Sequence, residues 1–224
     1  MSELIAGLQA APLWAQIGMA LFVLAFLVML IEPRLKRRKY AAKLTALATA
    51  AGAPTTRRDE FTEWFTIEVD RRAFEVRREL RVRGRGTTSY RGPTGHLLIT
   101  STPLSGSRWE MHQIDVMPGR LPGIFGPAPL ATGDSAFDKR FLTVQDGVPV
   151  REGWLDAPTR AALTAFFDTA GATGRVWVQA QQLQHVAVEP WNVTDWATLH
   201  GLLRQQAALA TALERTAGWR GPAA

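Results

Sequence analysis

The longest apolar run in the chain lies near its N-terminus. Residues 13–31 read LWAQIGMALFVLAFLVMLI, and no charged residue occurs between Glu3 and Glu32. As an α-helix these nineteen residues would extend about 28 Å, close to the thickness of the hydrocarbon core of a bilayer. Eleven of them are Leu, Ile, Phe or Val, each of which favours insertion by about 0.3 to 0.6 kcal/mol at the helix centre. The pattern predicts a transmembrane helix over 13–31.

The next segment, 40–51 (YAAKLTALATAA), is rich in helix formers and is followed by Gly52 and Pro54, which end helices. We expect the membrane helix to continue into this segment as a stalk. The stalk is either a simple spacer or, because its many alanines allow close packing, a surface for self-association.

Beyond residue 60 the hydrophobic period changes to two, which is typical of strands. Apolar and polar residues alternate over 60–82 on both sides of Asp70, and this predicts a β-hairpin. Residues 59–70 carry five acids and no base, whereas 71–91 carry eight arginines and two acids, so opposite charges are expected to meet across the hairpin. Arg78 falls on the apolar face, where it must lie at an edge or pair with a carboxylate.

Four further strands follow from the same alternation. Residues 96–102 and 108–116 are predicted to be joined by a hairpin turn at 103–106, and 175–179 and 185–189 form a second hairpin. Two glycine-rich stretches connect these elements. The stretch 84–95 lacks the spacing of a phosphate-binding loop and is read as a turn, and 117–132 is either packed over the core or exposed as an apolar lip for a partner.

Two helices are expected to cover the sheet. Asp156 is the predicted N-cap of the first, which ends near Gly171. Asn192 is the predicted N-cap of the second, with Trp191 and Trp196 forming a hydrophobic staple. The predicted fold class is therefore α+β: an N-terminal transmembrane helix with a stalk, then an antiparallel β-sheet domain with two covering helices.

The predicted organisation has five parts. A short extracytoplasmic N-terminus (1–12) precedes the span (13–31), and a basic juxtamembrane stalk and linker (32–58) leads to the soluble domain (59–216) and a flexible tail (217–224).

The net charge of +6 is unevenly distributed along the chain. Residues 1–31 carry −1, residues 32–58 carry +7, and residues 59–224 hold 18 basic and 18 acidic side chains, which cancel. A nucleic-acid-binding domain would carry the excess itself, so no nucleic-acid partner is expected.

The basic excess is concentrated directly after the span. Five cations lie there, namely Arg34, Lys36, Arg37, Arg38 and Lys39. Because such cations mark the cytoplasmic side of a membrane helix, we expect the N-terminus outside and the C-terminal domain in the cytoplasm. A cleavable signal peptide would instead carry its basic residues before the apolar run. The five cations can also bind anionic lipid headgroups, at about 1 kcal/mol each.

No catalytic or metal-binding motif is found. The chain has no cysteine, so disulfides and Cys-ligated metals are excluded. The four histidines, at 96, 112, 185 and 200, lie far apart and form no HExxH pattern. We expect no metal and no cofactor, and the sequence does not specify a small-molecule ligand.

The stretch from Gly133 to Val144 contains a GD-x-x-FD-x-RF-x-x-V box. Asp134 and Asp138 suit side-chain-to-backbone turn bonds, Phe137 and Phe141 suit anchoring in the core, and Arg140 suits pairing with a carboxylate. The box, followed by a Pro-Thr-Arg-Ala-Ala-Leu run, resembles the soluble domain of bacterial single-pass membrane-anchored families of uncharacterised function. The resemblance covers about 133–213 and implies no established reaction.

Three functions are compatible with these observations. The favoured hypothesis is a non-enzymatic interaction or assembly module at the inner face of the bacterial plasma membrane, with a protein partner or a homo-oligomer formed through the stalk or the domain surface. The alternative is a sensor of anionic lipid headgroups that uses the basic juxtamembrane segment. An enzyme using Asp134, Asp138 and a histidine from another strand is the second alternative.

Overall fold

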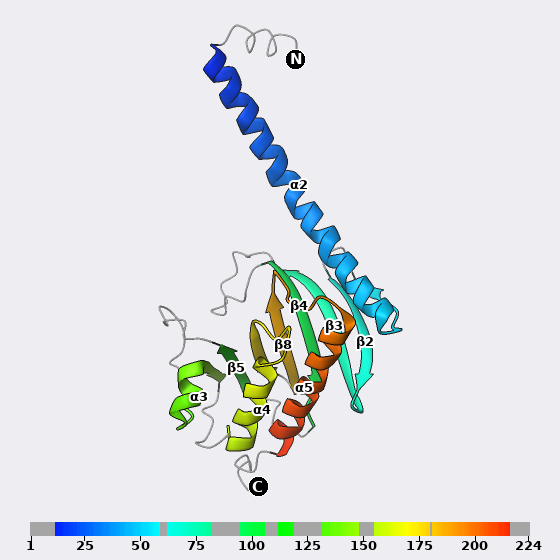
Figure 1. The fold of residues 1–224 in the computed structure, drawn as a ribbon, viewed down its shortest axis with the longest axis vertical. Helices are drawn as coiled ribbons and strands as arrows, with labels where there is room; N and C mark the ends of the chain where they lie inside the picture. The colour runs from blue at the N-terminus through cyan, green and yellow to red at the C-terminus, as the bar shows by residue number, and fades with distance from the viewer. Residues whose placement is uncertain are drawn as a thin grey trace. The chain divides into compact units, whose positions relative to one another are not determined.

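The computed structural model describes residues 12–58, 62–81, 95–105, 112–118, 131–147, 155–179 and 181–215. It has the predicted α+β architecture, with a long apolar N-terminal helix and an antiparallel sheet with further helices (Figure 1). Three predicted segments lie mostly or wholly outside the described residues: the turn 84–95, of which only Gly95 is described, most of the apolar stretch 117–132, and the tail 217–224.

Helix α2 spans Leu13–Ala50 and includes Pro33. The large apolar side chains in its first part are exposed within the chain; Phe22, for example, is 68% exposed. A core helix of a soluble protein would be mostly buried, but the apolar window of α2 has no buried residue. Among the described residues, α2 is the one helix that is long and apolar enough to cross a membrane.

The end of α2 belongs to the folded domain. The chain divides into two compact units, Met1–Ala42 and Lys43–Ala224, and Leu44, Leu47 and Ala48 are buried. Gly52, at φ +69°, ends the helix in a left-handed cap, with its N–H donating to the carbonyl of Thr49 at 3.0 Å. The stalk is thus not only a spacer, and its buried face is unavailable for self-association.

Within the described ranges the sheet has eight strands in the order β1-β2-β3-β4-β8-β7-β5-β6, and all neighbours are antiparallel. The strands are β1 (Thr56–Arg57), β2 (Thr62–Val69), β3 (Arg72–Arg81), β4 (Gly95–Pro103), β5 (His112–Pro118), β6 (Phe141–Gly147), β7 (Arg175–Gln179) and β8 (Gln182–Val188).

The β2–β3 hairpin confirms the period-two prediction. Its two-residue turn is Asp70-Arg71, both at positive φ (51° and 63°), as a type I′ turn requires. The expected pairing of opposite charges occurs at Arg78, which is 1% exposed and lies 3.4 Å from the carboxylate of Glu63 on β2. Arg77 instead lies near Glu75 and Glu79 of its own strand.

The predicted hairpin between 96–102 and 108–116 is wrong. Strand β4 pairs with β3 and β8, and β5 pairs with β6 and β7, so two strands separate β4 from β5. Alternation specifies which residues face the core but not which strand is the neighbour. The predicted hairpin of β7 and β8 is confirmed.

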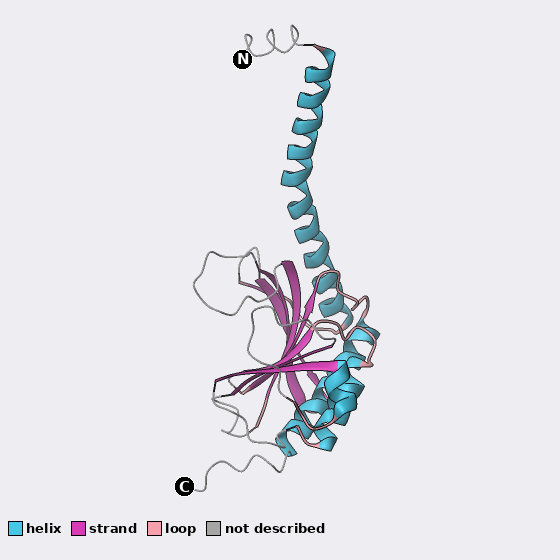
Figure 2. Ribbon diagram, turned by 90° about the vertical axis from the view of Figure 1, so that its left-hand side faces the viewer, coloured by secondary structure: helices cyan, strands magenta, loops and turns pink. Residues whose placement is uncertain are grey.

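Helices α4 (Ala157–Phe167) and α5 (Trp196–Arg215) lie on one face of the sheet (Figures 1 and 2). The buried Gln206 of α5 accepts from the Thr100 hydroxyl at 2.6 Å and donates to the carbonyls of Thr100 and Leu183. These bonds fix α5 over β4 and β8. The core side chains of α5 are Leu199, Leu202, Leu203, Ala207, Leu209, Ala210 and Leu213.

The predicted N-cap of α5 is also wrong. The carboxylate of Asp195, not Asn192, accepts from the N–H of Thr198 at 2.8 Å. This shift removes the Trp191–Trp196 staple, because these residues no longer occupy the N′ and N4 positions. Trp191 is instead buried and donates to the carbonyl of His96 at 2.9 Å. The first helix begins as predicted, with Asp156 accepting from the N–H of Thr159 at 2.9 Å.

The cap assignment predicts different effects for two neighbouring substitutions. Asp195→Ala is expected to lower the free energy of unfolding by about 1 kcal/mol, because it leaves helix N–H groups without an acceptor. Asn192→Ala, the matched control, is expected to change it by less than about 0.5 kcal/mol. Thermal unfolding of both variants in detergent measures the difference, and equal losses would contradict the assignment.

Candidate functional site

The GD-x-x-FD-x-RF box builds a short helix and one wall of a groove. Helix α3 spans Ser135–Arg140, where the sequence predicted turn bonds but no helix. The Asp134 carboxylate caps it by accepting from the N–H groups of Phe137 at 3.1 Å and Ala136 at 3.0 Å. Asp138 accepts from both the N–H and the hydroxyl of Thr132. Both box carboxylates therefore hold the backbone entering and forming α3.

Two ion pairs connect α3 to α4 at their two ends. The Asp134 carboxylate lies 3.2 Å from Nε of Arg160 at the start of α4. The Arg140 guanidinium at the end of α3 pairs with Asp168, the C-cap of α4. The hydrogen bond from the Phe137 N–H, with further help from Ala136 and Arg160, holds the pKa of Asp134 below its usual value.

The space between α3 and α4 is an open groove of about 520 Å³. Phe137 and Phe141 contribute to its lining. Both side chains are buried, and their ring centroids lie 4.7 Å apart. The groove is lined by Asp134, Ala136, Phe137, Arg140, Phe141, Ala157, Arg160, Ala161, Thr164, Ala165 and Asp168. It has an apolar centre with charged groups at both ends.

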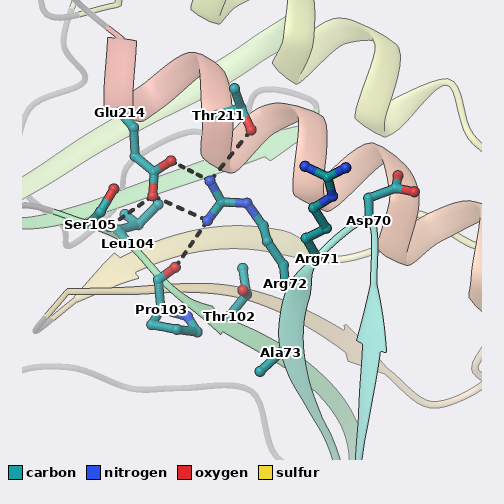
Figure 3. Close-up of a pocket in the computed structure, with 10 residues that line it drawn as sticks. All are labelled: Asp70, Arg71, Arg72, Ala73, Thr102, Pro103, Leu104, Ser105, Thr211 and Glu214. Carbon is teal, nitrogen blue, oxygen red and sulfur yellow. Dashed lines mark hydrogen bonds and ion pairs between the residues drawn. The ribbon is translucent and has the colours of Figure 1, made fainter.

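A second hollow, of about 490 Å³, lies where the β2–β3 turn approaches the last turn of α5 (Figure 3). Arg72 crosses this hollow and forms a bidentate ion pair with the carboxylate of Glu214. Its guanidinium also donates to the carbonyl of Pro103 at 3.2 Å. The backbone N–H of Ser105 donates to Glu214 at 2.7 Å. This hollow is lined by Asp70, Arg71, Arg72, Ala73, Thr102, Pro103, Leu104, Ser105, Thr211 and Glu214.

The charges in this second hollow neutralise each other. Partial burial would raise the pKa of Glu214, but the hydrogen bonds from Arg72 and Ser105 outweigh it, so the pKa lies below its usual value. Glu214 is therefore ionised at neutral pH and has no proton to donate as a general acid. The pair ties α5 to the hairpin and to the end of β4.

The histidines lie away from both hollows where their side chains are described. His185 is buried on β8, with Nε2 at 2.7 Å from the carbonyl of Thr173 and its ring against Phe166. His96 is buried on β4, and the His200 ring lies against Trp196 at a tilt of 46°. The side chain of His112 is outside the described part. Within the described ranges, no three His, Asp or Glu side chains gather to hold a metal ion.

The buried imidazole predicts a pH dependence of stability. Burial lowers the pKa of His185 to about 4, with the Thr173 hydrogen bond opposing the shift. The unfolded chain binds a proton near its normal pKa of about 6.5 while the folded chain does not, so stability falls as the pH drops from about 6.5 to about 4. Lowering the pH from 7.5 to 5 should therefore reduce the free energy of unfolding by about 2 kcal/mol through His185 alone.

His185→Gln keeps an amide donor for the Thr173 carbonyl and removes the titration. Urea unfolding of the wild type and this variant at the two pH values isolates the effect. An equal pH dependence in both proteins would show that His185 does not titrate as described.

The predicted lipid-facing cations lie on helix α2. Four of them, Arg34, Lys36, Arg38 and Lys39, are exposed, and Arg37 is half-buried. Lys36 also forms an exposed i,i+4 pair with Glu32 at 2.9 Å.

Comparisons with protein families, curated proteins and solved structures found no match for this chain.

Sequence reasoning did not identify Arg160, Asp168, Arg72 or Glu214. Their partners are 26, 28 and 142 residues away in the chain, and a single sequence gives no local signal for such pairs. Arg160 is the exception. It is the fourth residue of α4, and a cation this close to a helix N-terminus is unfavourable unless an anion lies nearby.

Proposed function

We propose that the protein is a single-pass membrane-anchored module that binds other proteins at the cytoplasmic face of the membrane and has no catalytic activity. The observation that carries the proposal is helix α2: its apolar part is exposed, while its last two turns belong to the folded domain.

The orientation rests on charge. Five cations follow the apolar run and none precedes it, so the positive-inside rule favours a cytoplasmic domain in a bacterial inner membrane. Two features of the domain support a binding role. The charges of residues 59–224 cancel. Both open hollows contain carboxylates that are engaged in ion pairs or backbone hydrogen bonds.

Crosslinking in native membranes tests the proposal. An amine-reactive crosslinker, which requires lysines such as Lys39, Lys43 and Lys139, is expected to convert the full-length protein into a discrete larger species. The control is the same protein diluted into detergent, where weak complexes dissociate. A protein that stays monomeric in membranes at every crosslinker concentration would contradict a role in interaction or assembly.

The exposed cations Arg34, Arg38 and Lys39 favour headgroup binding as a second role. Reconstitution into vesicles with and without anionic lipid tests it. A crosslinked fraction that is unchanged by anionic lipid content would show that headgroup binding by these cations does not control assembly.

A further inference from the structure

The hollow between the β2–β3 turn and the last turn of α5 contains a cation that is not engaged (Figure 3). Arg72 pairs with Glu214, and the carboxylate of Asp70 lies 3.5 Å from Nε of Arg204 on α5. Arg71, which also lines the hollow, is exposed and makes no hydrogen bond or ion pair with the residues that the structure describes. Three cations therefore face two carboxylates at this place, and one positive charge stays uncompensated.

The backbone position of Arg71 is unfavourable for an arginine. It is the second central residue of the type I′ turn, with φ +63°, where glycine is preferred. No hydrogen bond, ion pair or ring contact of its side chain within the described ranges offsets this preference. A role of the guanidinium in binding a ligand accounts for an arginine here, and a role in stabilising the turn does not.

The same hollow contains a buried hydroxyl without a hydrogen bond. Thr102 of β4 lies between Arg72 and Pro103 in the lining and is 0% exposed. Its Oγ1 has no hydrogen-bond partner among the described residues. Leaving a buried hydroxyl unpaired destabilises a folded domain. This observation does not depend on the charges, and it points to a polar ligand atom that binds the hydroxyl.

Charge and volume limit the chemical class of the ligand. A guanidinium binds a carboxylate or a phosphate through two parallel N–H···O bonds. The carboxylate of Glu214 lines the same hollow, so a second negative charge on the ligand would be repelled. One uncompensated cation therefore favours a monocarboxylate over a phosphate dianion. The volume of about 490 Å³ is within the range of small-molecule sites.

We propose that this hollow binds a small molecule with one carboxylate and one further polar group, the carboxylate on Arg71 and the polar group on the Thr102 hydroxyl. The proposal goes beyond the proposed function, because binding of a partner protein requires no small molecule. The Arg72–Glu214 pair connects the β3 wall of the site to the α5 wall. It is satisfied within the chain and does not itself bind the ligand.

Thermal unfolding of the full-length protein in detergent tests the role of Arg71. The probe is sodium acetate, raised to about 100 mM at an ionic strength kept constant with sodium chloride. For a Kd near 10 mM, the unfolding midpoint should rise by about 3 °C. Arg71→Gln should remove this rise. Arg58→Gln is the matched control, because it removes the same charge from an exposed arginine outside the lining and should keep the rise.

Thr102→Val tests the buried hydroxyl with sodium lactate, which adds a hydroxyl group to the carboxylate. Wild type should be stabilised more by lactate than by acetate, and Thr102→Val should lose this excess. Without a probe the variant should unfold at a higher temperature than wild type, because the unpaired hydroxyl is gone. Thr143→Val is the control: its hydroxyl is also buried without a partner, but Thr143 does not line the hollow, so the lactate excess should stay.

Each contrary result overturns a defined part of the proposal. A midpoint that neither probe raises, or that rises equally in Arg71→Gln and Arg58→Gln, overturns the site. A lactate excess that persists in Thr102→Val overturns the part assigned to Thr102. Inorganic phosphate overturns the carboxylate class if its effect, taken as wild type minus Arg71→Gln, exceeds that of acetate. Amine crosslinking in membranes tests the proposed function separately, and none of these results changes its outcome.

Discussion

Replacing Leu21 by arginine is expected to remove most of the protein from the membrane fraction. Leu21 lies one residue from the centre of 13–31 and is 60% exposed. A leucine there favours insertion by about 0.3 to 0.6 kcal/mol and an arginine opposes it by about 2.5 to 3.5 kcal/mol. The change of about 3 to 4 kcal/mol is comparable to the whole insertion free energy of the apolar run, which is several kcal/mol.

The matched control for this substitution is Leu35→Arg. Leu35 is on the same helix and is 58% exposed, but it follows Glu32 and lies among the cations. An added arginine there should leave membrane association unchanged or strengthen it. Sedimentation of membranes after high-salt and alkaline washing measures both variants. Equal retention of Leu21→Arg and wild type would contradict insertion of α2.

Removing the carboxylate of Glu63 is expected to produce the largest loss of domain stability. The guanidinium of Arg78 is 1% exposed and lies 3.4 Å from this carboxylate, whose side chain is 13% exposed. Glu63→Leu leaves a buried charge without its carboxylate, which typically costs about 3 to 5 kcal/mol. The control is Glu75→Leu on β3, where the partner Arg77 is partly exposed and the loss should stay below about 1 kcal/mol.

A double-mutant cycle distinguishes two causes of the stability loss in Glu63→Leu: the cost of leaving the buried Arg78 charge without this carboxylate, and the loss of the attraction between the two side chains. Combining Glu63→Leu with Arg78→Met removes both charges and should recover most of the stability, because apolar replacement of a whole buried pair is often nearly neutral. Urea unfolding of the four proteins gives the coupling energy. If the double variant is as unstable as Glu63→Leu alone, the buried guanidinium is not the cause of the loss.

The elements that could be predicted are those whose signal is local. The change from an uncharged helical run to period-two alternation predicted α2 and the β2–β3 hairpin. Asp156 with Pro158 fixed the start of α4, since a cap and a first-turn proline act within four residues. The cost of burying a charge predicted that Arg78 lies either at an edge or beside a carboxylate, and the structure has it beside Glu63.

Strand order and long-range pairs could not be predicted in this way. Strand β4 lies between β3 and β8, and its partners on β8 are 79 to 91 residues away in the chain. Alternation carries no information about such pairing. The N-cap of α5 was predicted at Asn192 instead of Asp195 because both residue types are good N-caps. Which of them caps the helix depends on where the helical backbone begins, at Trp196.

In the candidate site, too, local features could be predicted and long-range contacts could not. Within the box, the side-chain types of Asp134 and Asp138 were sufficient to predict hydrogen bonds to nearby backbone. The groove was not predicted, because it also requires Arg160 and Asp168 from α4, which packing brings next to α3.

The most direct test of the account is the location of the C-terminus. Two reporters fused after Ala224 suffice: a fluorescent protein that folds only in the cytoplasm and a phosphatase that is active only outside it. The account predicts a bright fluorescent fusion and an inactive phosphatase fusion, both in the membrane fraction. An active phosphatase, or a fusion protein that is soluble without detergent, would contradict it.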